Sequence, residues 1–160
     1  MKVAVNISIA VSAFMALLLV VTGYGLVRDV DALIDRAQVA ADREEMVEYI
    51  TELMENLERR GMTEGHFALV FRTPANDLAL HFRTLERILD RLHSIADIPK
   101  DETAYQVALN DIRGTIRELP NPGLKYLWAG YWYLYAVAFG IWGWPIVIQV
   151  LWPYGRVQKR

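Results

Sequence analysis

The chain contains no cysteine among its 160 residues, which excludes disulfides, iron–sulfur clusters and thiolate metal sites. It also lacks a dense basic patch, a phosphate-binding glycine loop, a G-x-S-x-G element and a serine–histidine pair. The three histidines, His66, His81 and His93, do not have the spacing of metal ligands. We therefore expect neither nucleic-acid binding nor enzymatic catalysis, and no bound metal or cofactor.

Charge is missing from two long stretches of the sequence. Residues 3–27 contain no charged side chain, and residues 124–152 contain only Lys125. A helix of roughly 20 apolar residues crosses a bilayer, so both stretches are long enough. The first exceeds the apolar part of a signal peptide, and no A-x-A-like cleavage site follows it, which favours a permanent span. The sequence predicts transmembrane helices at 1–27 and 124–153 and a basic tail at 154–160.

The distribution of charge predicts how the chain is threaded. All acidic residues lie between Asp29 and Glu118, whereas the two ends of the chain contain only basic ones. Basic residues close to a span favour the cytoplasmic side, and long loops count little in this rule. We expect an integral protein of the bacterial inner or plasma membrane, with both termini cytoplasmic and residues 28–123 extracytoplasmic.

The segment between the spans has the apolar period of amphipathic helices. Apolar residues recur three or four positions apart and predict helices at about 28–60, 74–96 and 101–119. The apolar stripes are narrow and the opposite faces are charged, as in an antiparallel helical bundle or coiled coil. The predicted fold class is an all-α membrane protein, with two transmembrane helices flanking this bundle.

Three full-length helices would end on the side opposite to their start, whereas the second span begins back at the membrane. A break near Asp42, which has capping-box spacing to Glu45, would solve this by making four helices. A third helix lying across the membrane surface would solve it too. Because no glycine or proline lies near Asp42, we favour a continuous first helix. That helix can also run on from the first span past Gly23 and Gly25.

Two further features of this segment have a simple structural interpretation. The linker 61–72 contains the apolar run Phe-Ala-Leu-Val-Phe at 67–71, which could plug the bundle, dip into the bilayer interface or contact a partner. The plug is the simplest of these. A row of glutamates lies on one face of the first helix, and without an E-x-x-H motif it indicates a solvated face. The row is Glu45, Glu48, Glu52 and Glu55.

Small residues recur at helical spacing in both predicted spans. Such faces let helices approach closely in lipid, where small residues favour helix association. The two spans of the chain packing on each other and an outside partner are both compatible with this pattern. The residues are Ala4, Ser8, Ser12 and Ala16 in the first span, and Ala136, Gly140 and Gly143 in the second.

All five tryptophans lie in or next to the second span. Counting back from Trp152 at about 1.5 Å per residue places Trp142 and Trp144 near the middle of the bilayer. Pro145 follows directly and should kink the helix. Indole N–H groups at that depth need partners, which indicates a contact with another protein, a quinone-like ring, a pigment or a specific lipid. The predicted contact residues are Trp142, Trp144, Tyr133, Tyr135 and Phe139.

These features favour a non-catalytic accessory subunit of a larger integral-membrane complex, energy-converting complexes included. Other membrane subunits and lipids would be its partners, with a quinone or pigment at the aromatic span. The alternative is an extracytoplasmic sensor or ligand-binding module. The order of span, outer bundle and span is similar, in architecture only, to the input half of a bacterial chemoreceptor. Only eight residues follow Trp152, so such a sensor would need a separate cytoplasmic partner.

Overall fold

The computed structural model describes residues 2–68, 71–137 and 140–141, without the side chains of residues 2–5 and 8. Within these residues the fold is helical, and β-structure is limited to one isolated bridge between His66 and Asp77. Gly23–Gly130 form one compact unit. Met1–Thr22 and Tyr131–Arg160, which we call the flanking segments, belong to another. The expected all-α class is confirmed. The helices are α1 (Lys2–Leu26), the π-helical turn η1 (Val27–Asp31), α2 (Ala32–Val39), α3 (Arg43–Arg59), the 3-10 turn η2 (Pro74–Asn76), α4 (Leu78–Ser94), α5 (Thr103–Arg117) and α6 (Gly123–Gly130).

One helix in the described part of the chain is long and apolar enough to cross a membrane, and it runs from Ile9 to Val39. It includes most of α1 together with η1 and α2, so the helix does continue past Gly23 and Gly25. The second predicted span, 124–153, is not confirmed. There α6 ends at Gly130, a bend follows, and residues 132–137 are again helical, while most of the remaining span lies outside the described residues.

The helix that we expected to be continuous over 28–60 is broken, so this prediction was wrong. The backbone becomes extended at Ala40, with φ −51° and ψ 135°. Asp42 then caps α3, because its Oδ1 accepts a hydrogen bond of 3.0 Å from the Glu45 N–H. Glu45 Oε2 in turn accepts a hydrogen bond of 2.6 Å from the Ala41 N–H. The Asp42 side chain satisfies one donor that the start of α3 leaves open, and the Glu45 side chain holds the residue before the cap. Neither contact needs glycine or proline.

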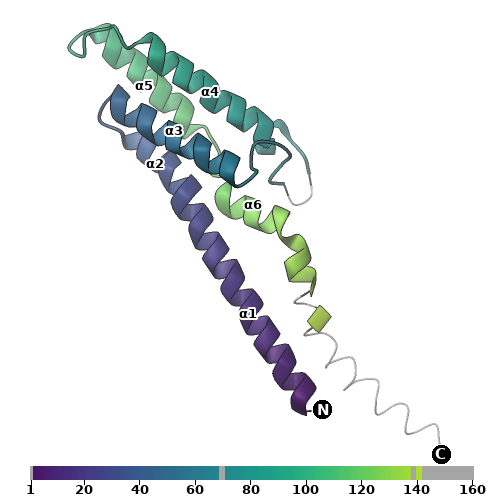
Figure 1. Ribbon diagram of the computed structural model, residues 1–160. Helices are drawn as coiled ribbons and strands as arrows, with labels where there is room; N and C mark the ends of the chain where they lie inside the picture. The colour runs from purple at the N-terminus through teal and green to yellow at the C-terminus, as the bar shows by residue number, and fades with distance from the viewer. Residues whose placement is uncertain (1, 69–70, 138–139, 142–160) are drawn as a thin grey trace, which may run out of the picture. The chain divides into compact units, whose positions relative to one another are not determined.

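The break produces a four-helix bundle instead of three helices (Figure 1). α2 packs against α3 and α5, and α4 packs against the same two helices. An even number of antiparallel helices returns the chain to the end at which it entered, so no helix has to lie across a membrane surface. We call the end where α1 enters and α6 begins the basal end, and the opposite end the distal end.

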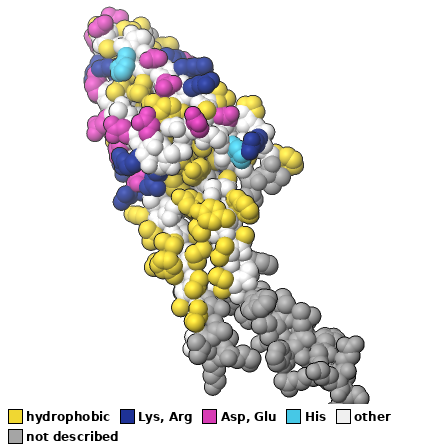
Figure 2. Space-filling model, turned by 45° about the vertical axis from the view of Figure 1, so that its right-hand side comes forward, with side chains coloured by type: hydrophobic (Ala, Val, Ile, Leu, Met, Phe, Trp, Pro, Cys, Tyr) yellow, Lys and Arg dark blue, Asp and Glu magenta, His cyan; other side chains and the backbone are white. Residues whose placement is uncertain are grey.

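Apolar side chains at helical spacing form the core of the bundle, and Figure 2 shows charged side chains gathered over its outer surface. Burial of each large side chain of this kind stabilises the fold by roughly 1.5–3 kcal/mol. The fully buried ones include Leu33 and Ile34 of α2, Met46, Ile50, Leu53 and Leu57 of α3, and Leu85, Ile88 and Leu92 of α4, while α5 adds Leu109, Ile112 and Ile116.

The ends of the other helices follow local capping chemistry. α3 ends at Arg59, and Gly61 follows its C-cap with φ +66°. The Met62 N–H donates to the Leu57 carbonyl at 2.8 Å, as in a Schellman motif. α4 begins at Leu78 rather than at 74, because the preceding Asp77 is its N-cap and residues 74–76 form only a 3-10 turn. α5 covers the predicted helix 101–119 except for two residues at each end.

Side chains of the distal end fix the turn between α2 and α3. Lys100 Nζ lies 3.0 Å from Asp42 Oδ2 and 2.7 Å from Glu44 Oε2. The Glu45 N–H and the Lys100 ammonium hold the pKa of Asp42 below its usual range. Arg113 Nη2 donates to the Ala40 carbonyl at 2.5 Å, and so satisfies an acceptor at the end of α2.

Candidate functional site

Of the five aromatic residues that the sequence predicts as contact residues, only Tyr133 and Tyr135 lie within the described residues. The side chain of Tyr133 is 49% exposed, and its ring centroid lies 6.3 Å from that of Tyr131. Tyr135 is partly covered. The other three predicted contact residues, Phe139, Trp142 and Trp144, lie outside the described residues, so the predicted mid-membrane contact stays a prediction.

The small residues of the flanking segments are mostly exposed where they are described. Ala16, Ala136 and Gly140 are exposed, and a Cβ built on Gly140 would meet no atom within 4 Å. Ser12 is partly buried. Within the described residues, Ala16, Ala136 and Gly140 are therefore not covered by contact between the flanking segments. The side chains of Ala4 and Ser8, and all of Gly143, lie outside the description.

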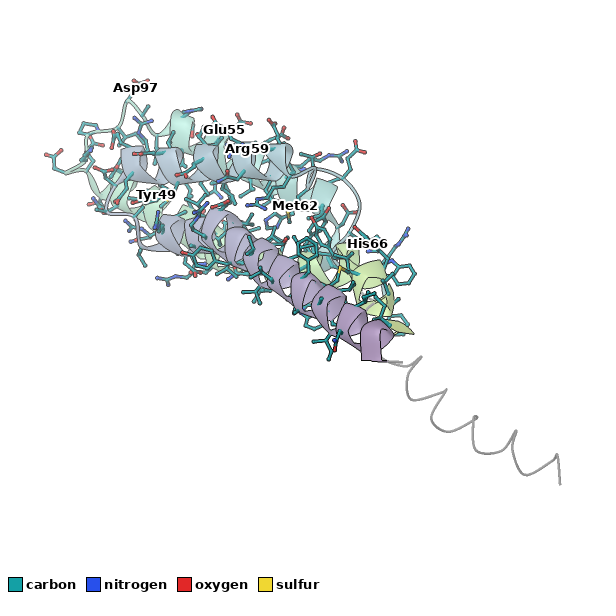
Figure 3. The ribbon with its side chains drawn as sticks, turned by 60° about the horizontal axis from the view of Figure 1, so that its bottom comes forward. Tyr49, Glu55, Arg59, Met62, His66 and Asp97 are labelled. Atoms are coloured by element: carbon teal, nitrogen blue, oxygen red, sulfur yellow. The ribbon has the colours of Figure 1, made fainter. Side chains whose placement is uncertain are left out.

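The polar groups of the bundle do not form a metal site in the described part of the chain. Glu48, Glu52 and Glu55 are exposed, which agrees with a solvated face along α3, and Figure 3 shows Glu55 on this helix. His93 is exposed, and the Nδ1 atom of His66 lies 3.2 Å from the Ala68 carbonyl oxygen.

His81 differs from the other histidines because it lies inside the bundle. Its side chain is 5% exposed, and its Nε2 has no hydrogen-bond partner in the described chain. Burial disfavours the charged imidazolium, and it lowers the pKa of His81 from 6.5 to about 4. The sequence did not predict the burial of His81. This histidine occupies a core position one helical turn before Leu85, where an apolar residue is expected.

Polar contacts gather at the basal end, where α1 passes into the π-helical turn of Val27–Asp31. Asp29 accepts a hydrogen bond of 2.6 Å from Arg28 Nε and one of 2.5 Å from Arg60 Nη2. The buried Asn56 donates from Nδ2 to the Asp29 carbonyl at 3.0 Å. A π-turn disturbs the regular helical hydrogen bonds. The end of α3 therefore supplies partners for both the backbone and the side chain of this turn.

The same turn caps the start of α6. Asp31 is buried, and its Oδ1 accepts a hydrogen bond of 2.8 Å from the N–H of Gly123. A carboxylate at this position satisfies a free donor and interacts favourably with the helix dipole. A Cβ on Gly123 would lie 2.8 Å from both carboxylate oxygens, so only glycine fits without a shift.

Two glycines of α1 allow a similarly close approach. A Cβ on Gly23 would lie 3.2 Å from Leu127 Cδ2 in α6, and one on Gly25 would lie 3.1 Å from Arg60 Nη2. The sequence indicated only that a membrane helix tolerates these glycines. The structure adds the reason for their small size, which is contact with α6 and with the end of α3.

The apolar linker is divided between the core and the surface. Phe67 is 5% exposed, and Lys125 Nζ of α6 lies 6.0 Å from its ring centroid. Phe71, in contrast, is 79% exposed. Phe67 thus fills the bundle as expected for this linker. The exposed side chain of Phe71 can contact another molecule or a membrane.

Comparison with protein-family models, curated proteins and solved structures finds no match to this chain. Its function is therefore inferred from its own residues. The relevant ones are the exposed small and aromatic residues of the flanking segments and the contacts of the basal end.

Proposed function

We propose that the protein is a non-catalytic subunit of a larger integral-membrane complex. Residues 1–27 and 124–153 are its two transmembrane helices, with both termini in the cytoplasm. The four-helix bundle of α2–α5 is its extracytoplasmic cap. The other membrane subunits bind along the transmembrane helices, where lipid, quinone or pigment also has access.

The apolar surface of α1 supports a membrane setting. Large apolar side chains, among them Phe14, Leu17 and Val20, are at least 60% exposed. Such a surface in a helix long enough to span a bilayer is satisfied by lipid tails or by other transmembrane helices. Lipid alone accounts for α1, but it gives no reason for the small residues.

The observation that favours a partner is the exposure of Ala16, Ala136 and Gly140. Contact between the two spans is the simplest explanation for these small faces, but in the part of the chain that the structure describes it does not cover these three residues. In lipid, small faces gain by the close approach of another helix, because van der Waals packing drives association there. Trp132 and Tyr133, both about half exposed or more, lie one turn away and enlarge the surface that a partner would cover.

Photo-cross-linking tests this proposal directly. A benzophenone amino acid replaces Ala136 in the full chain, and a matched control replaces Glu52 on the exposed face of α3. In native membranes we expect the Ala136 position to form one dominant adduct with another membrane protein and the Glu52 position to form none. The same partner should co-purify in fixed ratio. A clean monomer without a position-specific adduct would contradict the proposal.

The sensor function is favoured by a different observation. One helix, Ile9–Val39, runs from the predicted first span into the bundle, so a change in the bundle would reach the span along this helix. This function requires a soluble ligand of the bundle. A saturable shift in the melting temperature of the full chain with one class of small molecule would support the sensor function. This function does not require a cross-link from Ala136 to another membrane protein.

A further inference from the structure

A pocket of about 780 Å³ opens between the linker and the first turns of α4 at the basal end. Its volume lies within the range of ordinary ligand pockets. His66, which borders it, lies beyond the end of α3 and at the opposite end of the bundle from Asp97 (Figure 3). The charged and apolar residues that matter for its chemistry are Glu64, Arg72, Asp77, Leu80 and Arg83.

The walls of this pocket are held by backbone hydrogen bonds. The Phe67 N–H donates to the Asn76 carbonyl, and the Leu78 N–H donates to the Gly65 carbonyl, each at 3.0 Å. Asn76 Nδ2 also donates to the Phe71 carbonyl at 2.9 Å. The linker is thereby tied to the start of α4 on two sides, so the pocket exists before any ligand enters.

The charges of the pocket define its ligand. Neither Arg72 nor Arg83 forms an ion pair within the described chain, and both side chains are exposed. Two guanidinium groups are suited to a phosphate, which they bind through paired hydrogen bonds. Glu64 and Asp77 line the same pocket and would repel a purely anionic ligand. Two positive and two negative groups together favour a zwitterion with a phosphate and an ammonium.

The surroundings of the pocket favour a lipid as the source of this zwitterion. The linker lies at the basal end, where Phe67 meets Lys125 of α6 and where α1 enters the bundle. Phe71, next to Arg72, is 79% exposed, and Leu80 in the pocket wall is 41% exposed. Exposed apolar side chains beside a charged pocket fit the boundary between lipid headgroups and acyl chains.

We propose that this pocket binds the phosphoethanolamine headgroup of a membrane phospholipid. Arg72 and Arg83 bind the phosphate, and Glu64 and Asp77 accept hydrogen bonds from the ammonium. The inference rests on the proposed function only in placing the basal end beside a membrane. It is independent of the partner surface at Ala136.

Lipid titration of the delipidated full chain in mild detergent tests the proposal, with bound lipid counted by native mass spectrometry. We expect phosphatidylethanolamine to bind at least about tenfold more tightly than phosphatidylglycerol. The double variant Arg72→Gln/Arg83→Gln should lose about tenfold or more of this affinity. Arg87→Gln is the matched control, because Arg87 is exposed on the same helix outside the pocket, and it should bind as the native chain does.

Equal affinity for the two lipids, or an equal loss in Arg87→Gln, would overturn the proposal. Soluble phosphoethanolamine distinguishes a membrane lipid from a free small molecule as the ligand. If the soluble compound binds as tightly as the lipid, the lipid assignment is overturned. If the double variant loses its helical circular dichroism, Arg72→Lys and Arg83→Lys replace it. These variants should lose less affinity for phosphatidylethanolamine than the glutamine variant. A failed cross-link at Ala136 would leave these results unchanged, so the two proposals fail separately.

Discussion

Replacement of Gly123 by alanine tests the contact in which Asp31 of η1 caps the start of α6. The new Cβ would lie 2.8 Å from Asp31 Oδ1 and Oδ2 and 2.9 Å from Asp31 Cγ, closer than real Cβ contacts. The carboxylate belongs to a buried residue whose own backbone lies in the π-turn. It therefore cannot move aside as the tip of a flexible surface side chain would.

The size of the effect follows from two contributions. Forcing an extra methyl group into a packed site costs about 1–3 kcal/mol. If the carboxylate moves, the hydrogen bond from the Gly123 N–H is weakened, and a hydrogen bond to a charged group contributes about 1.5–3 kcal/mol. Because relief of the clash and loss of the hydrogen bond are alternatives, we expect a loss of about 1–3 kcal/mol. That corresponds to a melting temperature lower by about 5–20 °C for a unit of this size.

Thermal unfolding of the full chain in mild detergent, followed by circular dichroism, measures this loss. Gly114→Ala is the control, because Gly114 lies within α5 and a Cβ there meets nothing within 4 Å. This control should stabilise the chain by up to about 1 kcal/mol, since alanine favours the helix. A Gly123→Ala variant that melts with the native chain would refute the capping geometry.

A double-mutant cycle separates the clash from the lost hydrogen bond. Asp31→Ala alone removes the cap of α6 and should cost about 0.5–2 kcal/mol. It also removes the atoms that the new methyl group would meet. Gly123→Ala should therefore cost much less in the Asp31→Ala background than in the native one. Additive losses would show that the two residues are not in contact.

Three further predictions concern the bundle. The pKa of His81 is about 4 when folded and 6.5 when unfolded, so the unfolded chain binds more protons between these values. The free energy of unfolding should thus fall by about 1.5 kcal/mol from pH 6.5 to pH 5, and His81→Leu should abolish this component when melting is compared at both pH values. Arg113→Leu leaves the Ala40 carbonyl without its donor and should lower stability by about 1–2 kcal/mol in the same assay. Gly61→Ala, at φ +66° with nothing within 4 Å of its Cβ, should cost about 1 kcal/mol through backbone strain alone, and an unchanged melting temperature would contradict this.

Local patterns predicted the helices well because local chemistry determines where they begin and end. The apolar spacing defined α5 to within two residues at each end, and Gly61 ended α3 as its position indicated. The break before α3 was also visible in the Asp42–Glu45 spacing. The absence of glycine and proline favours a continuous helix only where side chains cannot cap the break, and here Asp42 and Glu45 do so.

The basal contacts could not be predicted, because they join residues that are distant in sequence. Asp31 and Gly123 are 92 positions apart, and Asn56 reaches a carbonyl 27 positions away. Nothing in the local sequence of Asp31 distinguishes it from the solvated acids of α3. The pocket between the linker and α4 differs, because all its lining residues lie between Glu64 and Arg83. Its shape depends on backbone hydrogen bonds between the linker and the start of α4, which side-chain patterns do not reveal.

The three close glycine contacts at the basal end bear on the choice between a fixed cap and a sensor. A sensor needs two arrangements of its output helix that differ by only a few kcal/mol. Gly23 fits against Leu127, Gly25 against Arg60, and Gly123 against Asp31, each at a distance that a methyl group would disturb. Sliding the helix by one turn would place larger residues against Leu127 and Arg60, and it would move Asp31 away from the Gly123 N–H. Each misfit costs about 1–3 kcal/mol, so the second arrangement would lie several kcal/mol higher. The geometry therefore favours a bundle in which the end of α1 and the start of α6 are held in one arrangement, so ligands of the bundle should leave the spacing of these two helix ends unchanged.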